Sequence, residues 1–226
     1  MELLVIGDVH GCYHTFKKLV EQHWDRERQV LVQLGDLVDR GNFSPETLLY
    51  AMELQRQHPD RVKLLKGNHE YEIVLYYREG NANWFRQCGE ETIAQFERRS
   101  LQLGTYAGWM AALSLYYETE HVFISHAGVS LDASDPLLES HSSSVLWNRG
   151  PLKNLGKLQL IGHTPCGSGR AEYDDRSNTL NLDTGAYEPG GLSAAVINGE
   201  GKIERILYCP TEPVDVQREL PSSRAK

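Results

Sequence analysis

The chain has 226 residues, 40% of them hydrophobic and 24% charged, with a formal net charge of −8. This length and composition indicate a single soluble α/β domain with one core. They exclude a membrane span, since no apolar run approaches about 18 residues, and the negative charge argues against binding to nucleic acid polymers.

The N-terminal residues 1–8 predict a first β-strand rather than a secretion signal, because they lack a basic leader and a long apolar segment. We therefore expect a cytoplasmic protein. The four cysteines lie far apart without Cys-x-x-Cys spacing, which favours reduced thiols over disulfides or a zinc knuckle.

The first third of the chain alternates between strand and helix patterns. Short apolar runs at residues 3–6, 30–34 and 62–65 are typical of buried parallel strands. Between them, residues 15–22 and 45–57 carry apolar side chains at helical spacing. The second helix is expected to have Ser44 as its N-cap and Pro45 in its first turn. A β-α-β-α-β start with right-handed crossovers is expected.

Residues 70–113 predict a helical insert that is broken near Gly80 and Gly89. Its aromatic residues recur at helical spacing, so we expect them in the core rather than at a recognition surface.

The second half predicts a more antiparallel arrangement. Strands are expected at residues 115–118, 121–125 and 158–161, followed by a meander over 171–208 that turns at Asp174-Asp175 and Asn198-Gly199. The polar residues 210–226 are expected to form a loosely held tail.

Groups that bind metal ions follow five of the predicted strands. Hard divalent cations prefer oxygen and imidazole ligands, which gather at the carboxyl ends of strands in an open α/β sheet. A single aspartate or histidine after a strand is commonly a turn residue. Five such loops, with glycines that permit tight turns, indicate one joint site. Its candidate residues are Asp8, His10, Asp36, Asn68, His69, His126 and His163.

Three of these loops carry complete motifs: GDVHG at Gly7–Gly11, GDLVDRG at Gly35–Gly41 and GNHE at Gly67–Glu70. With them the chain resembles the calcineurin-like metallophosphoesterases, and within these the bacterial and phage type of serine/threonine phosphoprotein phosphatase. The similarity extends through Trp147-Asn148-Arg149 to about Tyr208.

The resemblance implies a two-sheet β-sandwich flanked by helices, with a dinuclear metal site at the carboxyl ends of the strands. It implies a catalytic domain over residues 1–209 that includes the insert at 70–113, followed by the tail at 210–226.

The resemblance also implies the metal ligands. Asp8, His10 and Asp36 would bind one ion, and Asp36, Asn68, His126 and His163 would bind the other. The Asp36 carboxylate has two oxygens to share between cations about 3.5–4 Å apart, and a water held between them would become the attacking hydroxide. Manganese is expected, with iron, zinc, nickel and magnesium as alternatives.

By the same resemblance, His69 would be the general acid, and Asp39 would accept its other ring proton. The alternative for Asp39 is a carboxylate that only caps its loop.

Arg40 and Arg149, together with Asn68, would bind the phosphoryl oxygens, since a guanidinium matches their charge and geometry. Arg170 is the alternative to Arg149.

The expected function is hydrolysis of phosphate monoesters, with phosphoserine and phosphothreonine in proteins as the expected substrates. One alternative is cleavage of diadenosine tetraphosphate, because enzymes of that type share the GDVHGCY sequence found at Gly7–Tyr13. Glu70 and Asp39 favour the phosphatase. A second alternative is a non-catalytic scaffold, but such proteins usually lose His69 or several ligands, and none is lost here.

Overall fold

The computed structural model describes residues 1–188 and 190–216. The strands are β1 (Glu2–Ile6), β2 (Gln29–Gln33), β3 (Val62–Leu64), β4 (Tyr116–Glu118), β5 (Val122–Ser125), β6 (Leu158–Ile161), β7 (Glu172–Asp174), β8 (Thr179–Asn181), β9 (Gly191–Ile197) and β10 (Ile203–Pro210). The helices are α1 (Tyr13–His23), α2 (Ser44–Gln57), α3 (Asn68–Glu79), α4 (Glu90–Arg98), α5 (Ala107–Ala111) and α6 (Pro213–Val216), with a π-helical turn at Phe85–Gly89 and a 3₁₀ turn at Leu103–Tyr106.

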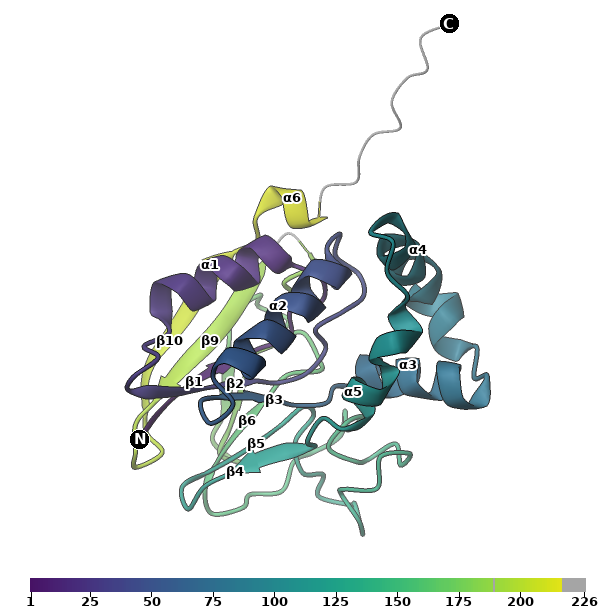
Figure 1. The fold of residues 1–226 in the computed structure, drawn as a ribbon. Coiled ribbons are helices and arrows are strands. Elements are labelled where there is room, and N and C mark those ends of the chain that lie inside the picture. The colour runs from purple at the N-terminus through teal and green to yellow at the C-terminus, as the bar shows by residue number, and fades with distance from the viewer. Residues whose placement is uncertain (189, 217–226) are drawn as a thin grey trace, which may run out of the picture.

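The strands form two five-stranded sheets, in the orders β10-β9-β1-β2-β3 and β4-β5-β6-β8-β7. Helices α1 and α2 cover the outer face of the first sheet, and α3 to α5 lie to one side (Figure 1). The predicted arrangement of two sheets flanked by helices is confirmed.

The inner strands β1, β2 and β9 of the first sheet are buried on both faces, which explains their apolar character, whereas the edge strand β10 is largely exposed. On β1, Leu4 and Ile6 face Phe16 of α1 and the rest of the helix-covered core. The alternate residues Leu3 and Val5 face the second sheet. The predicted parallel order of β1, β2 and β3 is confirmed.

The predicted turns at Asp174-Asp175 and Asn198-Gly199 are confirmed, but the single antiparallel meander over residues 171–208 is wrong. Only β7–β8 and β9–β10 form hairpins, and they belong to different sheets. β8 instead pairs in parallel with β6, and β9 pairs with β1. Turn residues specify a hairpin but not the sheet that it joins. The sequence therefore did not show that the two hairpins belong to different sheets.

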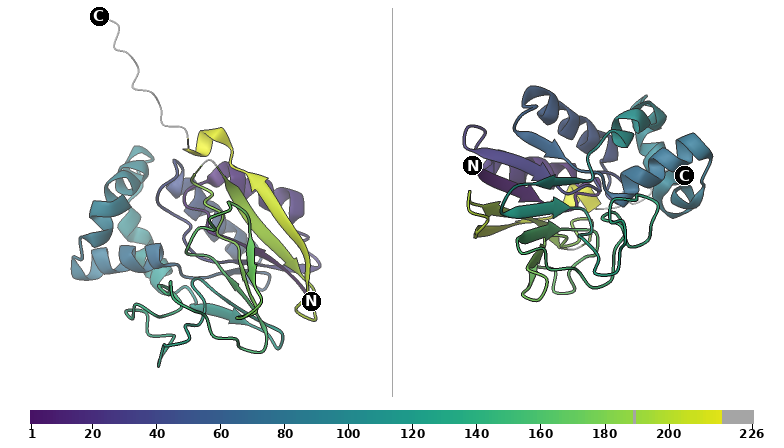
Figure 2. Two further views of the ribbon diagram at one scale, coloured as in Figure 1. Left: turned by 180° about the vertical axis from the view of Figure 1, so that it is seen from behind. Right: turned by 90° about the horizontal axis from the view of Figure 1, so that it is seen from below.

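Two breaks were predicted in the helical insert, near Gly80 and near Gly89, and only the first is present. Helix α3 ends at Gly80, which has a φ of +72°, but Gly89 lies inside a continuous helical segment. Gly89 is there because a Cβ would come within 2.7 Å of the Trp84 ring. Trp84 and Phe96 are buried in the core that α1 and α2 also line, as expected for aromatic residues at helical spacing. Figure 2 shows the insert beside the two sheets.

Ser44 is the first residue of α2 rather than its N-cap, a position that Phe43 occupies. The reason is that the Ser44 hydroxyl is used elsewhere: it accepts a hydrogen bond of 3.0 Å from the backbone N–H of Asp39. The start of α2 thus helps to shape the loop after β2.

Residues 210–216, expected in a loose tail, are attached to the domain. The buried Asp215 of α6 accepts hydrogen bonds from the backbone N–H of Thr15 at 2.8 Å, from its hydroxyl at 2.7 Å and from the backbone N–H of His14 at 3.1 Å. A carboxylate at the start of α1 is favourable because the first N–H groups of a helix lack partners. The rest of the predicted tail, residues 217–226, lies outside the described residues.

Along residues 1–188 and 190–216, every helix is too short or too polar to cross a lipid bilayer. All four cysteines are free thiols.

Candidate metal centre

The carboxylate of Asp36, at the end of β2, lies at the centre of the predicted site. Its Oδ2 atom is 3.5 Å from Nε2 of His10, 3.5 Å from Nε2 of His126 and 3.8 Å from Nε2 of His69. These rings come from the loops after β1, β5 and β3. Three imidazoles from three different loops therefore surround one buried carboxylate oxygen.

Two groups of metal-type ligands share Asp36. In the first, atoms of His10, Asp36 and His69 lie within 4.8 Å of one another, and in the second this holds for Asp36, His126 and His163. The Oδ1 atom of Asn68 adds to the second group, at 2.9 Å from Nε2 of His126 and 2.8 Å from Nδ1 of His163. The arrangement can hold two neighbouring cations on either side of Asp36.

Backbone carbonyls orient two of the histidines. Nδ1 of His10 lies 3.0 Å from the Val38 carbonyl, and Nδ1 of His126 lies 3.0 Å from the Leu34 carbonyl. Since a carbonyl only accepts, each ring carries its proton on Nδ1 and presents the Nε2 lone pair to the centre.

The electrostatics keep these rings neutral, which is the form that binds metal ions. Burial lowers the pKa of His10 to about 3, although the nearby Asp36 opposes this. Burial, reinforced by His126, lowers the pKa of His163 to about 2. Burial also lowers the pKa of His126.

Asp8 is a buried carboxylate that hydrogen bonds satisfy only in part. Its Oδ2 accepts a bond of 2.9 Å from the backbone N–H of His163, while Oδ1 has no hydrogen-bond partner among the described residues. Burial and the charges of Asp183 and Asp36 raise its pKa well above the usual value. Asp8 lies outside the two groups defined above, but a buried oxygen without a partner beside other acids suits a cation.

The donor set therefore fits divalent cations. It consists of carboxylates, neutral imidazoles and one amide oxygen, which are ligands for manganese, iron, zinc and similar ions.

Sequence reasoning missed Asp183, a second buried acid beside Asp8. Its Oδ1 accepts a 3.0 Å bond from the backbone N–H of Gly185, and burial raises its pKa to about 6. Asp183 follows β8, so it shows the same strand-end pattern as the predicted ligands. The wrong meander assignment concealed it.

Glu70, noted only as part of a motif, joins two of the metal-site loops. Its carboxylate accepts bonds from the backbone N–H groups of Asp36 and Leu37, both at 2.8 Å, and of Gly67 at 2.9 Å. These contacts fix the GNHE loop against the loop that carries Asp36.

His69 and Asp39 form a hydrogen-bonded pair at the edge of the centre. Nδ1 of His69 lies 2.5 Å from Oδ2 of Asp39. Burial lowers the pKa of His69, but the carboxylates of Asp36 and Asp39 outweigh it and raise the pKa to about 9. The Asp39 carboxylate also accepts bonds from the Trp84 indole N–H at 2.7 Å and from the Thr92 hydroxyl. Sequence reasoning missed both donors, since nothing in the chain linked the insert to Asp39.

Two exposed arginines flank the buried groups. Nη1 of Arg40 donates to the Tyr187 hydroxyl at 2.6 Å, and the Tyr187 ring lies edge-on to His10 with centroids 5.0 Å apart. Nη1 of Arg149 donates to the Thr164 hydroxyl at 2.8 Å. Both guanidinium groups are close enough to lower the pKa of Asp183.

Arg170, the alternative to Arg149, instead stacks 3.8 Å above the Tyr208 ring. Tyr187 is a further residue that the sequence did not single out.

The backbone is strained where the site is built. Seven non-glycine residues in the described ranges have a positive φ, and five of them belong to the predicted motifs and ligands: His10, Asp36, Asp39, Arg40 and His163. Such conformations cost on the order of 1–3 kcal/mol each and persist where the surroundings fix them. The loops are therefore shaped to place these side chains.

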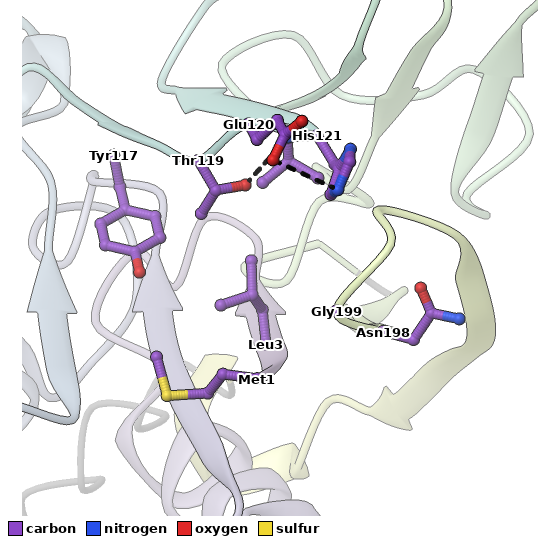
Figure 3. A pocket seen from close by; sticks show the side chains of 9 residues that line it. Met1, Leu3, Tyr117, Thr119, Glu120, His121, Asn198 and Gly199 are labelled. Atoms are coloured by element: carbon purple, nitrogen blue, oxygen red, sulfur yellow. Dashed lines mark hydrogen bonds and ion pairs between the residues drawn. The ribbon is translucent and has the colours of Figure 1, made fainter.

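A concave surface outside the candidate centre lies at the opposite end of the strands, before β1 and β5. It is lined by residues that include Met1, Leu3, Tyr117 and His121 (Figure 3). The contacts drawn there are local: a hydrogen bond to the Thr119 hydroxyl and the contact between the Glu120 carboxylate and the His121 ring. No group of three metal-type ligands was found among its described residues.

Comparison with known families gives a match over most of the chain. The profile described as calcineurin-like phosphoesterase matches residues 1–192. The serine/threonine-protein phosphatase 4 catalytic subunit of Candida glabrata is 37% identical over 95 residues, which cover 38% of this chain and 31% of that protein. The corresponding subunit of Saccharomyces cerevisiae is 36% identical over 95 residues, with the same coverage of 38% and 31%. The matched part thus spans about a third of these relatives.

Solved structures share the fold at low sequence identity. A Saccharomyces cerevisiae protein serine/threonine phosphatase with similarity to human PP5 superposes with a TM-score of 0.66 at 17% identity, covering 98% of this chain and 82% of that one. A putative diadenosine tetraphosphatase gives a TM-score of 0.60 at 17% identity, with coverage of 92% and 93%. A cold-active protein-tyrosine phosphatase of a Shewanella species gives 0.61 at 18% identity, with coverage of 90% and 79%.

Proposed function

Since this chain belongs to the calcineurin-like phosphoesterase family, we propose that it is a metal-dependent phosphatase that hydrolyses phosphoserine and phosphothreonine in proteins. The observation that carries the proposal is the Asp36 carboxylate shared by two ligand groups, with the His69–Asp39 pair beside it. The catalytic unit would comprise residues 1–209, including the insert at 70–113. We propose a cytoplasmic location and substrates that are phosphoproteins or small phosphoesters, rather than nucleic acid polymers or membranes.

Two divalent cations, manganese in the first instance, would be held by the proposed ligands. Asp8, His10 and Asp36 would hold one, and Asp36, Asn68, His126 and His163 the other. When bound, such cations withdraw charge from phosphoryl oxygens and make a water nucleophilic near neutral pH.

The residues of the chain would bind the phosphoryl group and supply the proton. Arg40, oriented by Tyr187, and Arg149, oriented by Thr164, present guanidinium groups that match phosphoryl oxygens. Asn68 would add an amide contact.

His69 would protonate the leaving oxygen. Because its Nδ1–H points at Asp39, the Nε2–H is left to be donated. The neighbouring carboxylates keep the ring protonated near neutral pH, since they raise its pKa to about 9 against the effect of burial. The alcohol product then leaves neutral.

Cleavage of dinucleoside polyphosphates is the second candidate, favoured by the GDVHGCY sequence at Gly7–Tyr13. The Cys12 thiol within it is buried and donates to the Ala186 carbonyl at 3.2 Å. The presence of a cysteine at position 12 is therefore explained by packing and does not distinguish between the two candidate substrates.

The two activities can be separated with one preparation. Purified protein with Mn²⁺ would be assayed against a phosphoserine peptide, a phosphothreonine peptide and diadenosine tetraphosphate, with Asp36→Asn as the inactive control. We expect faster release of phosphate from the peptides. Faster cleavage of diadenosine tetraphosphate would favour the second candidate, and no turnover of any substrate by the metal-loaded protein would favour a scaffold.

A further inference from the structure

The helical insert presents a cysteine to the His69–Asp39 pair. Trp84, Cys88 and Thr92 follow one another at intervals of four residues, so they share a helix face. The outer two donate hydrogen bonds to the Asp39 carboxylate. Cys88 lies between them in the π-helical turn and therefore faces the same pair.

The three polar groups are close enough to share an ion. Ligand atoms of Cys88, His69 and Asp39 lie within 4.8 Å of one another, and the histidine and aspartate are buried while the cysteine is half-buried. The Cys88 thiol makes no hydrogen bond to any of the described residues. Its sulfur is thus available to a ligand.

The donor set differs from that of the principal centre. Sulfur, nitrogen and oxygen together suit thiophilic cations such as Zn²⁺ and Cd²⁺, whereas Mn²⁺ and Mg²⁺ prefer oxygen. A tetrahedral zinc site has bonds of about 2.0–2.3 Å and therefore ligand atoms roughly 3.5 Å apart. The three ligand atoms lie within 4.8 Å of one another, so binding would require side-chain movements that bring them to that spacing.

We propose that Cys88, His69 and Asp39 form an inhibitory site for a thiophilic divalent cation, beside the proposed two-metal site and built on the proposed acid His69. The inhibitory effect rests on the proposed function, because it requires His69 to be the proton donor. On binding, the sulfur–metal bond replaces the S–H bond, and the cation replaces the proton between His69 and Asp39. Both protons pass to the solvent and nothing is oxidised or reduced. The Nε2–H of His69 then belongs to a metal-bound neutral imidazole, which is a much weaker acid than the imidazolium, so protonation of the leaving oxygen slows.

The test is a titration of the Mn²⁺-loaded protein with Cd²⁺, read in two ways. Thiolate–cadmium binding gives an ultraviolet charge-transfer band, which requires no enzymatic activity. Hydrolysis of p-nitrophenyl phosphate is measured in parallel samples. The variants are Cys88→Ala, Cys88→Ser as a second replacement of similar size, and Cys209→Ala as the matched control at a buried thiol on β10.

We expect a saturable band in the wild type and in Cys209→Ala that is absent from both Cys88 variants. We also expect half-inhibition of the Cys88 variants to require at least about 10-fold more Cd²⁺ than the wild type, the usual scale for impairing a metal site. Each activity is expressed relative to the same variant without Cd²⁺.

A band that persists in both Cys88 variants would overturn the site. A band that depends on Cys88 with equal inhibition of all variants would overturn the inhibitory role. If no phosphoester is hydrolysed by any variant, the proposed function fails, while the absorbance titration still decides whether the cation binds at Cys88.

Discussion

At the residue scale, the Asp36 carboxylate connects several parts of the candidate centre. Its Oδ1 accepts a bond of 3.0 Å from the backbone N–H of His69, and its Oδ2 faces three imidazoles. Burial opposes its ionisation, but the surrounding imidazoles, of which His69 is the protonated one, and the backbone N–H of His69 outweigh this and lower its pKa. It is therefore ionised and positioned before any cation arrives.

Replacing Asp36 with asparagine should reduce the occupancy of both metal sites, because the bridging charge is lost while the shape is kept. We expect elemental analysis of the dialysed protein to fall from two Mn²⁺ per chain to one or fewer. The exposed Asp132 offers a matched Asp→Asn control. Retention of two ions by Asp36→Asn would contradict the bridging role.

Replacing His69 with asparagine tests the acid separately from the metal ions. We expect kcat for a phosphoserine peptide to fall by roughly 10²–10⁴, the usual contribution of a positioned acid, with Mn²⁺ content preserved. His69 also lies within ligand distance of His10 and Asp36. A loss of Mn²⁺ in this variant would therefore reassign His69 as a ligand, and unchanged turnover would remove it from the mechanism.

At the scale of the secondary-structure elements, the insert connects to the chemistry through Asp39. Trp84 precedes the π-helical turn and Thr92 lies on α4, and both donate to the same carboxylate that holds His69. The insert thus helps to hold the pair of His69, the proposed acid, and Asp39, in addition to covering the core.

Replacing Thr92 with valine should weaken that support, because it removes the hydroxyl donor but keeps the branched shape. A hydrogen bond to a charged group contributes about 1.5–3 kcal/mol. We expect kcat to fall several-fold, with KM little changed. Thr92→Ser, which restores the hydroxyl, should recover most of the activity. Equal losses in both variants would indicate a packing effect instead.

Helix α6 holds the start of α1 through Asp215. Replacing Asp215 with alanine removes three hydrogen bonds from a fully buried carboxylate. We expect the free energy of unfolding, measured in urea, to fall by about 2–4 kcal/mol. The hydrogen bonds to the carboxylate are lost, and the donors on His14 and Thr15 are left without an acceptor. The Asp132→Ala variant is the exposed control. An unchanged midpoint would show that α6 is dispensable for stability.

The sequence predicted the first part of the fold better than the second for a physical reason. Parallel strands buried on both faces appear as continuous apolar runs, which the residues of β1, β2 and β3 display. The pairing of β8 with β6 and of β9 with β1 depends on long-range contacts that turn residues do not specify. The predicted ligand loops meet around Asp36 because strand ends converge in such sheets.

Supporting residues were less predictable. Trp84 and Thr92 lie 45 and 53 residues away from Asp39 in the chain, and only the folded insert brings them to it. Asp183 showed the right local pattern, but its strand was assigned to the wrong arrangement.

At the scale of the whole molecule, acidic groups from both sheets are buried at one edge. Asp8 follows β1, Asp36 follows β2 and Asp183 follows β8, and their mutual repulsion contributes to the raised pKa of Asp8 after the effect of burial. Divalent cations would relieve this repulsion.

The metal-free protein should therefore melt at a lower temperature than the Mn²⁺-loaded protein, since a ligand that binds the folded state stabilises it. Differential scanning calorimetry with and without a chelator measures the shift. The shift should shrink in Asp36→Asn. Equal melting temperatures for the two wild-type samples would contradict cation binding among these acids.

The hydrogen bond between Asp8 and the backbone of His163 joins positions 155 residues apart. A nascent chain emerging from the ribosome therefore carries the opening motifs long before it can complete the centre. During that interval the early carboxylates and imidazoles offer only partial coordination, so tight metal capture must await the second half of the polypeptide. Metal incorporation would then report that the two sheets have docked, and a product that ends before His126 would lack the proposed ligands His126 and His163.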